Sequence, residues 1–216
     1  MNVTLEVAIF GAVVTAIGWL ITHILTTSAE SRRQRLISQM EFTKQQLEEL
    51  YGPLTFLILE GDQTFQDFNA ALGWKEDPPE GYVLSEQERQ TVFFWVENDF
   101  FPRNKKIQEL LSSKTHLIEG EVVPESFLIF LDHYNSWYIN HLRLQKQGIE
   151  YGWRSKIAWP INFNKDVTDS FKYLKKRHAD LIGMIAEAPS FRYQVWRKFG
   201  RKIPQKQIDQ EANKLT

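Results

Sequence analysis

Residues 7–27, VAIFGAVVTAIGWLITHILTT, decide the fold of this chain, because they contain one ionisable side chain, His23, in 21 residues. As an α-helix rising about 1.5 Å per residue, this stretch is about 31 Å long, close to the thickness of the hydrocarbon part of a bilayer. A helix satisfies its own backbone hydrogen bonds, as any segment in lipid must. We therefore predict one transmembrane helix within an anchor of residues 1–29.

Two other interpretations of this stretch stay open, namely a cleaved signal peptide and the core helix of a soluble domain. The first six residues, MNVTLE, contain no basic side chain, and no clear Ala-x-Ala cleavage pattern follows the apolar stretch. A signal peptide ordinarily has both features and a shorter apolar part. The sequence therefore favours an anchor that is not cleaved.

The charges that flank the stretch predict its orientation. Arg32, Arg33 and Arg35 follow it closely, whereas only Glu6 precedes it. Because basic residues stay on the cytoplasmic side, we expect the N-terminus outside and the C-terminal domain in the cytoplasm, on the inner (plasma) membrane. His23, near the cytoplasmic headgroups, is either a proton-sensing group or, as position favours, a histidine tolerated at the interface.

One face of the predicted span carries only small residues: Gly11, Thr15, Gly18 and Thr22. Small side chains let two helices approach closely in lipid, where apolar burial does not drive association. This face predicts self-association or pairing with another membrane protein. The alternative is that single-pass spans often contain small residues without pairing.

The composition of the chain narrows its function. Lys and Arg number 26 and Asp and Glu 27, so no overall charge attracts nucleic acid, and cysteine is absent. Neither Asp132 with His133 and His141 nor the residues around His116 have the spacing of a metal site. Zinc-protease, phosphate-loop, hydrolase and dinucleotide-binding motifs are all missing. We therefore expect no catalytic residue, no metal, no cofactor and no enzymatic activity.

Apolar periodicity predicts that everything behind the anchor is helical. Leu36, Met40, Thr43, Leu47, Leu50 and Leu54 form an apolar seam with alternating spacings of four and three. This seam predicts a juxtamembrane stalk helix over residues 30–53, paired in a coiled coil or packed on its own domain. Gly52-Pro53 predict a stop or kink, and Pro102 a kink or restart.

Further helices are predicted for 54–72, 85–117, 124–147 and 165–188, with a capping box at Ser85 to Glu88. Patterns that alternate as strands do are nearly absent. We predict an all-α fold, in which the transmembrane helix continues into the stalk and then a four- to five-helix bundle of residues 54–188.

Three segments carry a resemblance to a known family. They are LEELYGPL at 47–54, NKKIQELLSSKTHLIEGE at 104–121 followed by PESF at 124–127, and NKDVTDSFKYLKKRHADLIG at 164–183. Together they resemble uncharacterised bacterial single-pass membrane proteins with a juxtamembrane Leu-Tyr-Gly-Pro-Leu segment and a helical cytoplasmic domain. The resemblance covers most of the chain and implies a bacterial inner-membrane setting, but no activity for any residue.

Two segments are candidates for binding. The loop 151–163, YGWRSKIAWPINF, offers Trp153, Arg154 and Trp159 to a ligand or partner, although its aromatics more simply pin a long loop to the bundle. The segment 189–216 interleaves aromatic and basic side chains, and is either a lipid-surface contact or a final helix with a solvated basic face. The lipid-contact candidates are Arg192, Trp196, Arg197, Lys198, Arg201 and Lys202.

Two hypotheses about function follow from this organisation. The first is a membrane-anchored helical interaction or scaffold module without catalytic activity, which docks a protein partner or self-assembles through its span and stalk. The second is a sensor or effector subunit that binds a small ligand in the bundle beneath its aromatic loop. A large apolar cavity reached by Trp153 and Trp159 would favour the second hypothesis. A filled core with an exposed apolar patch would favour the first.

Overall fold

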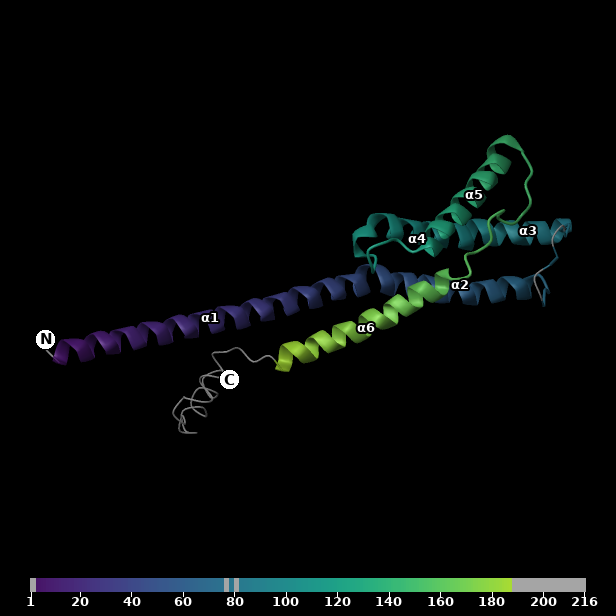
Figure 1. Cartoon of the computed structure of the whole chain (residues 1–216). Coiled ribbons are helices and arrows are strands. Elements are labelled where there is room, and N and C mark those ends of the chain that lie inside the picture. Colours follow the sequence, from purple (N-terminus) through teal and green to yellow (C-terminus); the bar gives the residue numbers. More distant parts are fainter. Residues whose placement is uncertain (1–2, 76–77, 80–81, 188–216) are drawn as a thin grey trace, which may run out of the picture. The chain divides into compact units, whose positions relative to one another are not determined.

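The computed structural model describes residues 3–75, 78–79 and 82–187, and this part of the chain is all-α, without a strand. Figure 1 labels its helices. The predicted fold class is therefore confirmed. The chain divides into two compact units. One comprises the described residues up to Glu41 and from Ala179 on, and the other, called here the helical unit, comprises Phe42–His178.

Helix α1, Val3–Gln45, contains the apolar stretch. Near the N-terminus it is long and apolar enough to cross a membrane, and its most apolar part is not buried against the protein. The large side chains from Ile9 to Leu25 are half or more exposed. Such a surface suits lipid, although a signal sequence near an N-terminus can meet the same criteria of length and composition.

Neither proline ends its helix, because a π-helical turn precedes each one. After α1, the turn η1, Gln46–Tyr51, leads into α2, Gly52–Ala71. Likewise α3, Glu86–Trp95, continues through η2, Val96–Phe100, into α4, Phe101–Ser113. A proline ring in a regular α-helix clashes with the carbonyl four residues earlier. That carbonyl lies inside the π turn in both cases, so the wider turn accommodates the ring.

Local signals set the other helix ends. Ser85 caps α3 by the predicted capping box, because its side chain accepts from the Glu88 amide while the Glu88 carboxylate accepts from the Ser85 amide. After the short 3-10 helix η3, Thr115–Leu117, helix α5 runs over Glu125–Gln147. It ends at Gly148, whose positive φ of 67° favours glycine. Helix α6 is Phe163–Glu187.

Within the helical unit, α2 lies alongside α3 and α4, and α5 packs on α4 (Figure 1). The start of α6 joins α5 through Phe163, whose ring stacks on Phe130 at 4.8 Å, and through Asp166, which accepts from the Ser126 hydroxyl at 2.6 Å. The core includes these fully buried side chains: Leu50, Tyr51, Leu54, Val92, Phe127, Phe130, Phe163, Val167 and Leu174. The last part of the predicted seam is therefore packed inside this chain.

Candidate ligand-binding site

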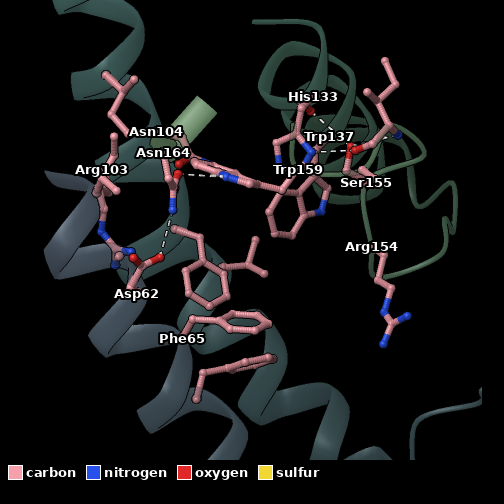
Figure 2. Close-up of a pocket in the computed structure, with 18 of the residues that line it drawn as sticks. Asp62, Phe65, Arg103, Asn104, His133, Trp137, Arg154, Ser155, Trp159 and Asn164 are labelled. Carbon is pink, nitrogen blue, oxygen red and sulfur yellow. Dashed lines mark hydrogen bonds between the residues drawn. The ribbon is translucent and has the colours of Figure 1, made fainter. Parts of the chain in front are cut away.

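The helical unit contains a cavity of about 640 Å³ between α2, the run from α3 to α4, α5 and the loop 148–162. Figure 2 shows its lining. Six aromatic side chains line it: Phe65, Phe68, Phe100, Trp137, Trp153 and Trp159. The polar side chains in its wall include Asp62, Arg103, Asn104, His133, Ser155 and Asn164. Aromatic walls with a few placed polar groups are typical of small-molecule sites.

Phe100, the last residue of η2, is the centre of the aromatic wall. Its ring centroid lies 5.2 Å from that of Phe68, 6.5 Å from Phe65 and 6.2 Å from Trp137. The contact with Phe68 is edge-to-face, a favourable arrangement of aromatic quadrupoles. The π turn therefore places the Phe100 ring between aromatic side chains of α2 and of α5.

The aromatic loop reaches the cavity through a chain of hydrogen bonds. The indole N–H of Trp159 donates to Asn164 Oδ1 at 3.1 Å, and Asn164 Nδ2 donates to Asp62 Oδ1 at 3.2 Å. Dashed lines in Figure 2 mark both bonds. These two hydrogen bonds connect the loop to the first turn of α6 and to α2. Asn164 therefore uses both ends of its amide within the protein.

His133 fixes the other side of the loop. Its Nδ1 lies 2.5 Å from the Ile157 carbonyl oxygen, and its own carbonyl accepts from the Ser155 hydroxyl at 3.1 Å. Because a carbonyl only accepts, Nδ1 carries the proton in this bond. Burial lowers the pKa of the His133 ring, and hydrogen bonds to the backbone of Ile157 and Ala158 oppose that shift. His133 therefore holds the loop as a neutral donor.

Arg103 crosses the cavity wall close to α2. It is 8% exposed and forms an ion pair with Asp99, one turn earlier. Burial lowers the pKa of its guanidinium, and the charges of Glu60 and Asp62 oppose the shift. A Cβ atom at Gly61 would lie 2.8 Å from Arg103 Nη1, so glycine leaves the room that the guanidinium occupies.

Asn104, the next residue, has a different environment. It is 6% exposed and lines the cavity. No side-chain hydrogen bond joins its amide to any residue that the structure describes. The other two buried polar residues of the described lining are Arg103 and His133. His133 bonds to the Ile157 carbonyl and Arg103 pairs with Asp99, although Arg103 Nε has no hydrogen-bond partner. Asn104 therefore offers the cavity a donor and an acceptor that the fold does not use.

A second polar cluster lies outside the cavity lining and ties the loop to η2. His141 is buried between Glu97, whose Oε1 lies 3.0 Å from Nε2, and Tyr151, whose hydroxyl lies 3.0 Å from Nδ1. Gln145 also donates to Glu97 Oε1 at 2.9 Å. Burial raises the pKa of the Tyr151 hydroxyl to about 12. This phenol stays protonated at neutral pH, so the cluster acts as a structural clamp.

The residues singled out from the sequence fall in different places. Trp153, Arg154 and Trp159 line the cavity, with the Arg154 guanidinium 4.4 Å from the centre of the Trp153 ring. The structure thus brings the loop aromatics to a cavity and also packs them, since Trp153 contacts Trp74 at 5.3 Å and Trp159 contacts Phe130 at 5.4 Å.

The other candidates lie elsewhere. In the span, the hydroxyls of Thr15 and Thr22 donate to the Gly11 and Gly18 carbonyls at 2.8 Å. The basic residues that predict the orientation of the span lie further along α1: Arg32, Arg33 and Arg35. The candidate lipid contacts from Arg192 to Lys202 are outside the described residues. In the part of the chain that the structure describes, no three His, Asp or Glu side chains gather as a metal site would require.

The cavity residues on α2 and α4 were not found from the sequence. A signal was present at Asn104, a polar residue that interrupts the apolar stripe of Phe100, Ile107 and Leu111 at spacings of four, three and four. Comparison of the chain with protein-family models, curated proteins and solved structures finds no match.

Proposed function

We propose that this protein is a membrane-anchored, small-ligand-binding sensor or effector subunit, whose helical unit takes the ligand in its aromatic cavity. The observation that supports the proposal is the cavity itself, with Trp153 and Trp159 in its wall. Its volume of about 640 Å³ lies within the range of roughly 300–1,000 Å³ usual for small-molecule sites. Buried aromatic faces supply affinity, and the few polar groups select among ligands.

The proposed setting is the inner membrane of a bacterium, with the N-terminus outside and the helical unit in the cytoplasm. The long apolar helix near the N-terminus supports an anchor. Arg32, Arg33 and Arg35, which follow the apolar stretch, support a cytoplasmic C-terminal side. An anchored receptor of this kind would respond to a ligand in the cytoplasm next to the membrane.

Binding of quinoline, a planar aromatic probe soluble in water, tests this function. The full chain in lipid nanodiscs is titrated with quinoline by saturation-transfer NMR, with empty nanodiscs as the blank for partition into lipid. Ala158 is an exposed residue of the loop that lines the cavity, so Ala158→Trp fills the site without disturbing the core. The matched control is Ala70→Trp, at an exposed site on α2 outside the lining.

The expected result is saturable binding to the native chain and to Ala70→Trp, with affinity at least about tenfold weaker in Ala158→Trp, since a filled cavity loses its apolar contacts. Binding that is equal in the two tryptophan variants, or no binding to the native chain, contradicts a ligand site in this cavity.

A second candidate function is self-association or partner pairing through the span. The observation that favours it is the open face of α1 at Gly11 and Gly18, where an added Cβ would meet nothing within 4 Å. The threonine hydroxyls on that face bond within their own helix, which leaves its surface without unsatisfied donors in lipid. This function is compatible with ligand binding, because the span and the cavity are separate sites.

A further inference from the structure

The chemistry of Asn104 narrows the class of ligand. Asn104 lies in α4, one turn after Phe100, the last residue of η2, and one turn before Ile107, and all three residues line the cavity. Residues four apart on a helix share a face. The aromatic wall at Phe100 and the amide at Asn104 therefore border the same side of the cavity.

A buried amide without a hydrogen bond destabilises a protein, because its polar groups lose their water. Asn104 is 6% exposed and has no partner among the described residues, and its amide atoms stay accessible from the cavity, so the amide loses part of its hydration. A leucine of similar size would avoid that cost. Polar groups retained at a cost to the fold are typical of binding sites.

Most of the neighbouring polar groups are engaged within the protein. Asn164 is occupied by Trp159 and Asp62, and His133 is occupied by the Ile157 carbonyl. Arg103 is paired with Asp99, although its Nε has no hydrogen-bond partner, and neither does the indole N–H of Trp137. Asn104 therefore has both a donor and an acceptor that no described protein atom uses, whereas the unpaired groups of Arg103 and Trp137 can only donate.

A carboxamide presents an N–H donor and a carbonyl acceptor side by side. The edge that complements it carries the same two groups in reverse order, as in a lactam or a nucleobase, and two parallel hydrogen bonds form between such edges. A planar ring that bears this edge would also lie against the aromatic wall. Resting on the proposed function, we infer that the ligand is a planar heterocycle with an adjacent ring N–H and carbonyl, which Asn104 binds through both groups.

Two probes of the same ring size separate this inference from the proposed function. Quinoline has the bicyclic frame without the N–H and carbonyl edge, and 2-quinolone has the same frame with it. In an apolar cavity without a polar partner, 2-quinolone binds more weakly, because its amide loses water without compensation. A preference for 2-quinolone therefore requires a paired donor and acceptor in the wall.

The experiment titrates both probes into the full chain in nanodiscs, for the native protein, Asn104→Leu and the control Asn140→Leu, which lies outside the cavity lining. We expect the native chain and the control to bind 2-quinolone about tenfold more tightly than quinoline. In Asn104→Leu we expect that ratio to fall to one or below, with quinoline binding retained and the thermal midpoint of the unliganded protein unchanged or raised.

Each other outcome has a definite meaning. If the native chain binds quinoline as tightly as 2-quinolone or more tightly, the inference is wrong while the ligand site stands. A preference for 2-quinolone that persists in Asn104→Leu also overturns the inference, as does an Asn104→Leu variant with a lowered thermal midpoint, which would make the amide structural. If neither probe binds at a site that Ala158→Trp blocks, the proposed function fails together with the inference.

Discussion

The guanidinium of Arg103 occupies the space that a side chain at Gly61 would fill, since a Cβ atom on the glycine would lie 2.8 Å from Nη1. Glycine inside a helix ordinarily costs roughly 0.5–1 kcal/mol relative to alanine. Here the missing side chain allows a buried cation to reach α2, where the charges of Glu60 and Asp62 act on it. The two residues are therefore energetically coupled.

We predict that Gly61→Ala gives none of the usual stabilisation of about 1 kcal/mol in the native background, because the guanidinium must move. In an Arg103→Met background the same change should recover that gain. Chemical denaturation of the four proteins in this double-mutant cycle measures the coupling. An equal effect of Gly61→Ala in both backgrounds would show that the two residues do not interact.

Gly52→Ala should be strongly destabilising. A Cβ atom there would lie 2.6 Å from the backbone oxygen of Leu47, within the π turn that accommodates Pro53. A backbone carbonyl gives way less easily than a side chain, so we expect a loss of about 2 kcal/mol in the free energy of unfolding. The matched control is Gly183→Ala, also helical, where a Cβ would meet nothing within 4 Å. It should be neutral or stabilising, and a comparable loss in both variants would contradict the packing argument.

The pH dependence of stability should include a contribution from Glu88. Hydrogen bonds from Ser85, and a further bond from the Tyr82 hydroxyl at 2.9 Å, lower the pKa of this carboxyl to about 2. The folded-state pKa is below the unfolded value, so the carboxylate stabilises the fold above the unfolded pKa of about 4.3. That stabilisation is lost as the pH falls from there toward 2.

We therefore predict that Glu88→Gln lowers the free energy of unfolding at pH 7, with a difference from the native protein that shrinks steadily below pH 4. Denaturant titrations at several pH values measure it. The control is Glu86→Gln in the same turn, whose carboxylate accepts a hydrogen bond from the exposed Gln90. A difference that is the same at pH 7 and pH 3 would rule out the carboxylate charge as the source.

Replacing Gly11 and Gly18 together with leucine should weaken self-association of the full chain in lipid by roughly tenfold, which corresponds to about 1.4 kcal/mol. Bulky side chains on the open face would keep two helices apart. Energy transfer between labelled chains in nanodiscs or liposomes measures the association. Val13→Leu, on another face of α1, keeps the span apolar and should have no effect. A native chain that is monomeric, or variants that associate as the native chain does, would reject this face.

The sequence predicts those features whose causes are local. The capping box at Ser85 and the glycine at Gly148 act within one turn, so α3 begins and α5 ends close to where they were expected. Apolar periodicity likewise predicts the all-α class. The two π turns were not predictable, because a proline at Pro53 or Pro102 fits equally well with a kink, a stop or a widened turn.

The cavity depends on tertiary structure and was only partly visible beforehand. Trp153 and Trp159 are candidates from the sequence because the loop 151–163 is rich in aromatic residues. Whether they pin the loop or line a site depends on the space that α2 and α4 leave unfilled. Asn104 carries a signal in its apolar stripe, yet the sequence cannot show which polar groups of the lining have partners within the protein and which do not. That property requires the coordinates of all the elements around it.

The most direct test of the ligand site is the position of a bound probe. Nuclear Overhauser contacts from quinoline to the full chain, with its tryptophans selectively labelled, locate the probe in solution. We expect contacts to the indole protons of Trp137, Trp153 and Trp159 that disappear in Ala158→Trp. Contacts confined to tryptophans outside the cavity lining, or contacts unchanged by that substitution, would contradict a ligand site in this cavity.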